Sequence, residues 1–156
     1  EKINYYDVNI HRSEDIVLNY KIKKCDGKIL LLPNVKIYYK TRSKYLEFIK
    51  HSYDNGKWSI LPIFLTKAFP FSVRHLIPLF FTCYLVSILL FQNFAVSKLY
   101  NYPFYFYLIT SALFSLFLSI KNKSIAQFIF LPIAYFSLHI AYGIGSITAI
   151  LSRPFK

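Results

Sequence analysis

The second half of the chain is an almost continuous apolar sequence that short polar loops divide. Three stretches contain no charged residue, 76–97, 102–120 and 125–151. A helix needs about 20 mostly apolar residues to cross the ~30 Å hydrocarbon core of a bilayer. Backbone polar groups inside hydrocarbon must find partners within their own segment, which a helix provides. The pattern therefore predicts three transmembrane helices over these stretches.

The first half begins with a pattern typical of a short helix. Ser13 is a common N-cap residue, and Glu14 and Asp15 follow it in the first turn, where carboxylates complement the helix dipole. Apolar residues at helical spacing continue from there, and lysines gather towards the end. Gly27 is then expected to end the helix in the left-handed conformation.

Two strands and a second helix are predicted next. The apolar run 28–32 is typical of a buried strand, and alternating polarity over 35–40 predicts a half-exposed strand. From 43 to 53 the apolar residues return at helical spacing, which predicts an amphipathic helix. We expect the Asn-Gly step at 55–56 to end that helix.

These elements divide the chain into three parts. Residues 1–58 form a polar part, 59–75 an interfacial segment that prolines make too broken to span, and 76–156 a membrane region. A core of about 55 residues is marginal by itself. The chain also begins at Glu1 and contains no methionine. We therefore expect a C-terminal fragment whose polar part belongs to a larger domain with further sequence upstream.

Charge is unevenly distributed along the chain. The net charge is +12, and all seven acidic residues lie at or before Asp54. The positive-inside rule places the polar part and the loop at 121–123 on the cytoplasmic side. The basic C-terminal tail would then lie outside, against the same rule. A break in the third stretch, at Pro132 or at 143–145, would resolve this conflict.

Few residues inside the apolar stretches suggest chemistry. His139 lies within the third stretch, where an ionisable group indicates either function or a hydrogen bond to a neighbouring helix, and the second interpretation is favoured. Gly143 and Gly145 favour close helix packing over phosphate binding, because no strand precedes them. Two cysteines are too few to indicate a disulfide framework or a metal site.

Several short motifs nevertheless follow one another in a recognisable order. They are Glu14-Asp15, Gly27-Lys28-Ile29, Pro33, Tyr39-x-x-Arg42-Ser43, Asn55-Gly56-Lys57-Trp58, Val73-Arg74-His75-Leu76-Ile77-Pro78 and Leu138-His139-x-Ala141-Tyr142-Gly143-x-Gly145. From about Tyr5 to Leu151 this order resembles the membrane-bound family 2 glycosyltransferases of bacteria, near the succinoglycan-biosynthesis type. The resemblance implies an α/β fold class. Residues 1–58 would be the C-terminal part of a GT-A type nucleotide-sugar transferase domain, and an all-α membrane region with about three transmembrane helices would follow.

The resemblance also implies an activity, namely inverting transfer of a sugar in surface polysaccharide synthesis. Asp15 would be the general base that takes the proton of the acceptor hydroxyl, with Glu14 as its partner on the acceptor side. Arg42 is a candidate phosphate contact, although an exposed salt bridge is an equal interpretation. Lys57 and Trp58 are candidate substrate-binding residues, and anchoring at the membrane interface is the stronger interpretation of both.

The same resemblance implies a metal cofactor, substrates and a location in the cell. The family's Asp-x-Asp metal motif is absent here, so Mg or Mn is expected only in the full-length enzyme, on ligands outside this chain. The donor would be a nucleotide sugar and the acceptor polyprenyl-linked or saccharide, with membrane lipid as a partner and no nucleic acid. His51 and Asp54 stand where processive relatives have Gln and Arg, which favours transfer of a single sugar. The location implied is the bacterial inner membrane, with the catalytic part cytoplasmic.

A second function remains open from the residues themselves. An acidic pair in the first turn of a helix is more often a complement to the helix dipole than a catalyst. The alternative is a non-enzymatic small membrane protein whose basic cytoplasmic part docks a partner or anionic lipid.

Overall fold

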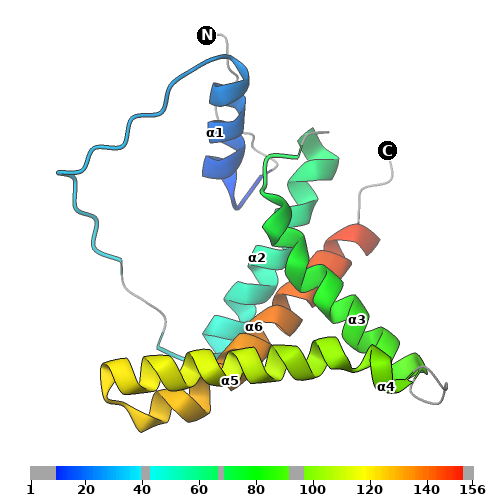
Figure 1. Cartoon of the computed structure of the whole chain (residues 1–156). Helices are drawn as coiled ribbons and strands as arrows, with labels where there is room; N and C mark the ends of the chain where they lie inside the picture. Colours follow the sequence, from blue (N-terminus) through cyan, green and yellow to red (C-terminus); the bar gives the residue numbers. More distant parts are fainter. Residues whose placement is uncertain (1–9, 40–42, 67–68, 92–96, 153–156) are drawn as a thin grey trace.

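The computed structural model describes residues 10–39, 43–66, 69–91 and 97–152, and in these ranges the secondary structure is helical (Figure 1). The elements are α1 (Glu14–Lys24), α2 (Tyr45–Thr66), the 3₁₀ helix η1 (Val73–Leu76), α3 (Ile77–Phe91), α4 (Ser97–Tyr100), α5 (Tyr102–Asn122) and α6 (Ile125–Leu151). The described residues contain no strand. The predicted α/β fold class is therefore wrong, and no remnant of a nucleotide-sugar transferase sheet is present in this part of the chain.

The two predicted strands are instead irregular, exposed chain. Leu31 is 89% exposed and Ile37 is 86% exposed. A turn at Pro33 and Asn34 separates the two runs, and the N–H of Val35 donates to the carbonyl of Leu32 across it at 3.3 Å. A strand is stabilised by a neighbouring ladder, and the described residues contain no strand that could pair with either run. Apolar sequence without that partner does not form a sheet.

The membrane half of the prediction is confirmed in its coarse form. Three helical segments are long and apolar enough to cross a membrane, Val73–Phe91, Tyr102–Asn122 and Ile125–Leu151. The third covers the predicted span 125–151 and runs unbroken through the two possible break points, Pro132 and residues 143–145. Without a break, three complete spans would still put the basic C-terminal tail outside, against the positive-inside rule.

Helix α2 is longer than the sequence predicts. It continues through Gly56 and Pro62 to Thr66, so the predicted end at residues 55–56 is wrong. The predicted border between the polar part and the interfacial segment falls inside this helix. Gly56 and Pro62 are both buried, because tertiary packing overrides the weak helix propensity of these residues.

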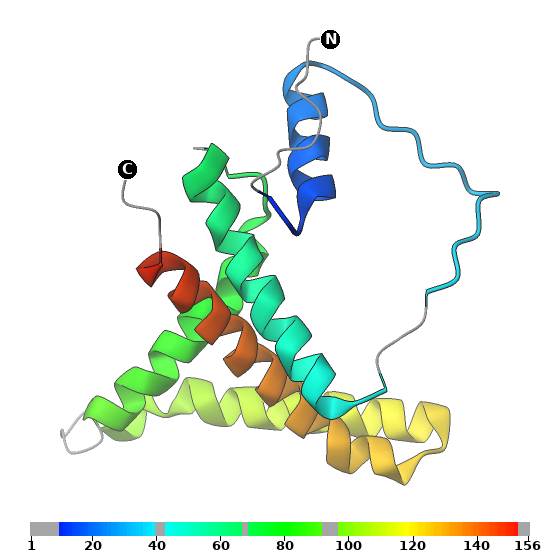
Figure 2. The same cartoon turned by 180° about the vertical axis from the view of Figure 1, so that it is seen from behind.

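The tightest packing in the molecule joins α2 to α6, which lie side by side in both views (Figures 1 and 2). A Cβ atom on Gly56 would lie 1.9 Å from the carbonyl oxygen of Tyr142, and one on Gly145 would lie 2.0 Å from the carbonyl oxygen of Tyr53. The buried hydroxyl of Ser146 donates to the carbonyl of Gly56 at 3.1 Å. Small residues let the two backbones approach closely, as they do between helices in membranes.

The opposite side of α6 contacts α3 and α5. A Cβ atom on Gly143 would lie 2.0 Å from Oγ1 of Thr82 in α3. The hydroxyl of Thr82 donates to the carbonyl of His139 at 3.3 Å. Nδ1 of His139 lies 2.7 Å from the carbonyl of Tyr135 on its own helix, and 3.4 Å from the hydroxyl of Tyr107 in the neighbouring α5. The prediction that the glycine pair permits close helix packing is thus confirmed.

Helix α1 ends differently from the prediction. The left-handed residue is Asp26, with φ of 57°, and not Gly27. The N–H groups of Asp26 and Gly27 donate to the carbonyls of Lys23 (3.1 Å) and Ile22 (2.9 Å). This pattern is a Schellman motif, and Asp tolerates its left-handed position better than most residues with a side chain.

Candidate functional site

Glu14 and Asp15 occupy the first turn of α1, as predicted, and both are exposed. Ser13 precedes them, but its side chain makes no capping hydrogen bond and its φ is 61°. Within the described part of the chain, neither carboxylate makes a hydrogen bond or an ion pair. An exposed carboxylate can act as a general base for a hydroxyl that is held within hydrogen-bond reach while that hydroxyl attacks an electrophile. The structure therefore leaves the acidic pair accessible, which fits a catalytic role without requiring one.

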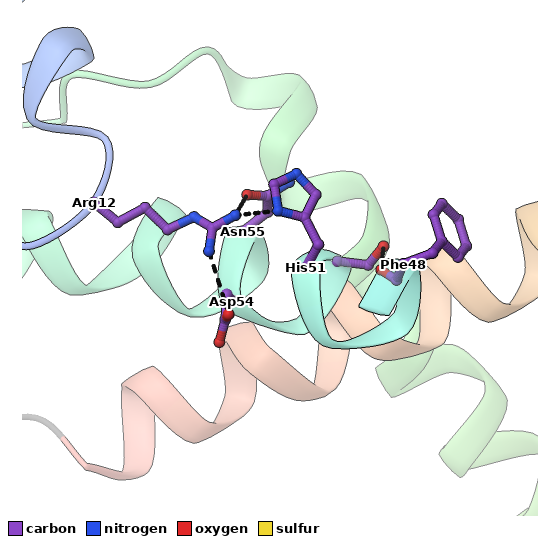
Figure 3. A network of polar contacts seen from close by, with 6 residues as sticks. Arg12, Phe48, His51, Asp54 and Asn55 are labelled. Carbon is purple, nitrogen blue, oxygen red and sulfur yellow. Dashed lines mark hydrogen bonds and ion pairs between the residues drawn. The ribbon is translucent and has the colours of Figure 1, made fainter. Parts of the chain in front are cut away.

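Arg12, two residues before the acidic pair, is held on α2 by its side chain. Figure 3 shows the side chain of Arg12 reaching over the polar face of that helix. Its guanidinium donates to Oδ2 of Asp54 at 3.2 Å and to Oδ1 of Asn55 at 2.9 Å, and it contacts Nδ1 of His51. Because arginine has only donors, this contact requires His51 to accept at Nδ1. The start of α1 is thus attached to a helix that packs on the membrane region.

Further contacts support this attachment. The ring of His11 meets the indole of Trp58 edge-on, with centroids 5.9 Å apart. Ile10 and Val17 are buried, at 5% and 3% exposure. Apolar burial and the Arg12 contacts therefore act together on the segment that carries Asp15. We call the contacts of His11 and Arg12 with α2 the α2 anchor.

A small polar pocket lies at the α2 anchor. It has a volume of about 260 Å³ and is lined by Arg12, Glu47, Lys50, His51 and Asp54. Two cations face two carboxylates, so the pocket has no strong field of one sign. Such a lining suits a neutral group that both donates and accepts hydrogen bonds, such as a sugar hydroxyl, better than a bare phosphate.

No pattern in the sequence predicted this group of polar side chains. His51, Asp54 and Asn55 are spaced three and four residues apart, which places them on one helix face and could have marked them as a polar surface. The partner of that surface could not have been found in the same way, because Arg12 precedes Asp54 by 42 residues. No local pattern links positions so far apart.

The other predicted site residues are not gathered around the acidic pair. Lys57 and Trp58 are half-buried on α2, and Trp58 contacts His11. In the described residues no hydrogen bond, ion pair or ring contact joins either of them to Glu14 or Asp15. Arg42 lies outside the residues that the structure describes. Among the described ranges, no group of three or more His, Cys, Asp or Glu side chains could hold a metal ion.

The α2 anchor can be tested by Arg12→Ala. The guanidinium and the Asp54 carboxylate are about 30% exposed, so solvent screens part of their attraction. We expect the free energy that holds α1 on α2 to fall by about 1–2 kcal/mol. This value lies between those typical of exposed ion pairs and of hydrogen bonds to charged groups. Because α1 has few other contacts with the described residues, amide hydrogen exchange should rise about tenfold in α1, and stay unchanged in α6.

Lys44→Ala is the matched control for this experiment. Lys44 pairs with Glu47 at 3.8 Å on the exposed surface of the same polar region. Removing an exposed pair of this kind should leave exchange in α1 unchanged. Equal exchange in Arg12→Ala and the parent protein would show that the α2 anchor does not hold α1.

The chain was compared with known protein families, with curated proteins and with solved structures, and none of the three comparisons finds a match.

Proposed function

We propose that this chain is the acceptor-side, membrane-bound part of an inverting glycosyltransferase, with Asp15 as the general base. The proposal is supported by the order of sequence motifs that resembles membrane-bound family 2 enzymes. The single structural observation in its favour is the placement of Asp15. This carboxylate is exposed on the first turn of α1, and the α2 anchor attaches that turn to a helix packed on α6.

The proposed reaction needs one base at the acceptor. The acceptor hydroxyl oxygen forms a bond to the anomeric carbon of a nucleotide sugar, and the bond from that carbon to the diphosphate oxygen breaks. The hydroxyl proton moves to the Asp15 carboxylate, and the nucleoside diphosphate leaves with the electron pair. Attack from the face opposite the leaving group inverts the anomeric configuration. Glu14 would assist on the acceptor side.

The proposal assigns the donor site and its Mg or Mn to residues outside these 156. The acceptor would be polyprenyl-linked or a saccharide, which suits a base held beside a membrane. We place the protein in the bacterial inner membrane with Asp15 on the cytoplasmic side, where the basic residues of the polar part agree with the positive-inside rule. Arg42, Lys57 and Trp58 stay candidate substrate contacts, and single-sugar transfer is the expected outcome.

The test is a transfer assay on the full-length protein in bilayers. Nucleotide sugars with a labelled sugar are supplied with Mg or Mn and a polyprenyl-linked saccharide whose free hydroxyls can accept the sugar, and the product is analysed for its anomeric configuration. We expect one sugar per acceptor with inverted configuration. Hydrolysis or transfer that retains the configuration would contradict the mechanism. Absence of transfer from every nucleotide sugar tried would favour the non-enzymatic alternative.

A further inference from the structure

One surface of the molecule is far more apolar than an exposed surface should be. Every residue from Lys23 to Tyr39 is exposed. We call residues 28–39 the apolar loop. Its exposed large apolar side chains are Ile29, Leu30, Leu31, Leu32, Val35, Ile37, Tyr38 and Tyr39. A contiguous apolar surface of this kind marks a contact with a protein or with lipid.

The form of the apolar loop argues against a strand-like protein contact. A strand added to a sheet edge needs a continuous row of backbone donors and acceptors. Pro33 lacks the donor, and the turn that it opens directs the N–H of Val35 back to the carbonyl of Leu32. The two apolar runs are therefore short and lie on either side of a bend. A bent loop with aliphatic side chains near its tip is better suited to entering a soft surface.

The charges around the apolar loop indicate that the surface it contacts is negatively charged. Five lysines, Lys21, Lys23, Lys24, Lys28 and Lys36, lie in or just before it, against one carboxylate, Asp26. Clusters of four or more cations in a chain that is anchored in a membrane are typical of segments that bind anionic lipid headgroups. Tyrosines of the kind present at 38 and 39 favour the headgroup level, because the ring is apolar and its hydroxyl is polar.

We propose that the apolar loop docks on the anionic lipid surface of the membrane in which the same chain is anchored. The lysines lie among the lipid phosphates, and the leucines around Leu31 reach the boundary of the acyl chains. The irregular backbone stays at headgroup level, where water and lipid oxygens can satisfy it, since it could not enter the hydrocarbon core. Anchoring through α3, α5 and α6 keeps the loop at high effective concentration near that surface.

This docking would have a structural consequence for α1. The helix would be held at one end by the α2 anchor and at the other by lipid, because the apolar loop begins directly after the Schellman motif at Asp26. The inference does not depend on catalysis at Asp15, and it would hold for a protein that transfers no sugar.

The experiment measures how deeply the loop enters the bilayer. Leu31→Cys is labelled with an environment-sensitive fluorophore in a Cys25→Ser, Cys83→Ser background, with one copy of the full chain in each nanodisc. Lipids that carry a nitroxide on the acyl chain quench labels that reach them. Asn19→Cys on the exposed face of α1 is the control outside the bilayer, and Leu90→Cys on the exposed face of α3 is the control inside it.

We expect quenching at position 31 to be several-fold stronger than at position 19 and weaker than at position 90. The effect should require phosphatidylglycerol mixed into the phosphatidylcholine bilayer, and should fall at high salt. Replacing the five lysines by glutamine should reduce quenching to the value in pure phosphatidylcholine.

Three results would overturn the proposal. Quenching at position 31 as weak as at position 19 in both bilayers would show that the loop stays in water. Equal quenching with and without phosphatidylglycerol would show that anionic lipid is not the partner. An apolar environment reported by the label at position 31 only in nanodiscs that hold two copies, without quenching by the lipid nitroxide, would assign the surface to a contact between chains.

Discussion

The variant Gly56→Val should separate α2 from α6. A Cβ atom at this position would lie 1.9 Å from the carbonyl oxygen of Tyr142, which is backbone and cannot rotate away. Overpacking a well-packed contact costs typically ~1–3 kcal/mol. Here two helix backbones must move apart, so we expect the free energy of unfolding to fall by an amount at or above the upper end of that range. The same displacement would break the hydrogen bond from Ser146 to the carbonyl of Gly56.

The single tryptophan provides the measurement. Trp58 lies two residues from Gly56 on the same helix, so its fluorescence reports the surroundings of α2 during unfolding in denaturing detergent. We expect the Gly56→Val transition at a much lower detergent fraction than that of the parent protein. Ala126→Leu adds the same three carbon atoms at an exposed position of α6 and should unfold like the parent. Coincident transitions for Gly56→Val and the parent would refute the close approach of α2 and α6.

The membrane helices could be predicted from the sequence because their physical requirement is local. A run of apolar residues without charge must satisfy its own backbone in lipid, so its helical form does not depend on distant partners. This explains why the predicted spans 102–120 and 125–151 agree with the helices Tyr102–Asn122 and Ile125–Leu151. Pro132 did not break the last helix, since neighbouring helices and local adjustment tolerate proline in such segments.

The predicted strands failed because a strand depends on residues elsewhere. The pattern at 28–32 and 35–39 has the right residue types, but the described chain provides no ladder for it. The predicted end of α2 was wrong because a partner is present where the sequence does not indicate one. Gly56 is a common helix terminator in sequence, whereas here a close contact with the backbone of α6 selects it within a helix. Neither partner is visible in a local window of sequence.

The candidate site divides in the same way. The place of Glu14 and Asp15 in the first turn of α1 follows from a local preference for carboxylates there, and the structure agrees. The contact of Arg12 with Asp54 and His51 joins positions about 40 residues apart, which no spacing rule predicts. What a sequence can indicate is the polar face of α2, and not the residue that covers it.

Asp15→Asn should abolish most sugar transfer by the full-length protein while leaving its fold intact. The amide has the size of the carboxylate but cannot take the proton of the acceptor hydroxyl. A positioned general base contributes typically about 10²–10⁴-fold to the rate, so a loss within that range is expected. Donor binding should be unchanged, because the proposal assigns the donor site to residues outside this chain. The exposure of Asp15 makes a structural effect of the substitution small.

Asp26→Asn is the matched control, since it makes the same chemical change at an exposed carboxylate at the other end of α1. Asparagine tolerates the left-handed conformation that Asp26 adopts, so both transfer and stability should be retained. Loss of transfer in this control as large as in Asp15→Asn would point to a general effect on α1 and not to catalysis.

The most direct test of the proposed function is the turnover of Asp15→Asn at saturating nucleotide sugar, measured beside its donor affinity. The proposal predicts turnover reduced by about 10² or more, with the affinity for donor unchanged. Turnover equal to that of the parent protein would contradict the assignment of Asp15 as the general base.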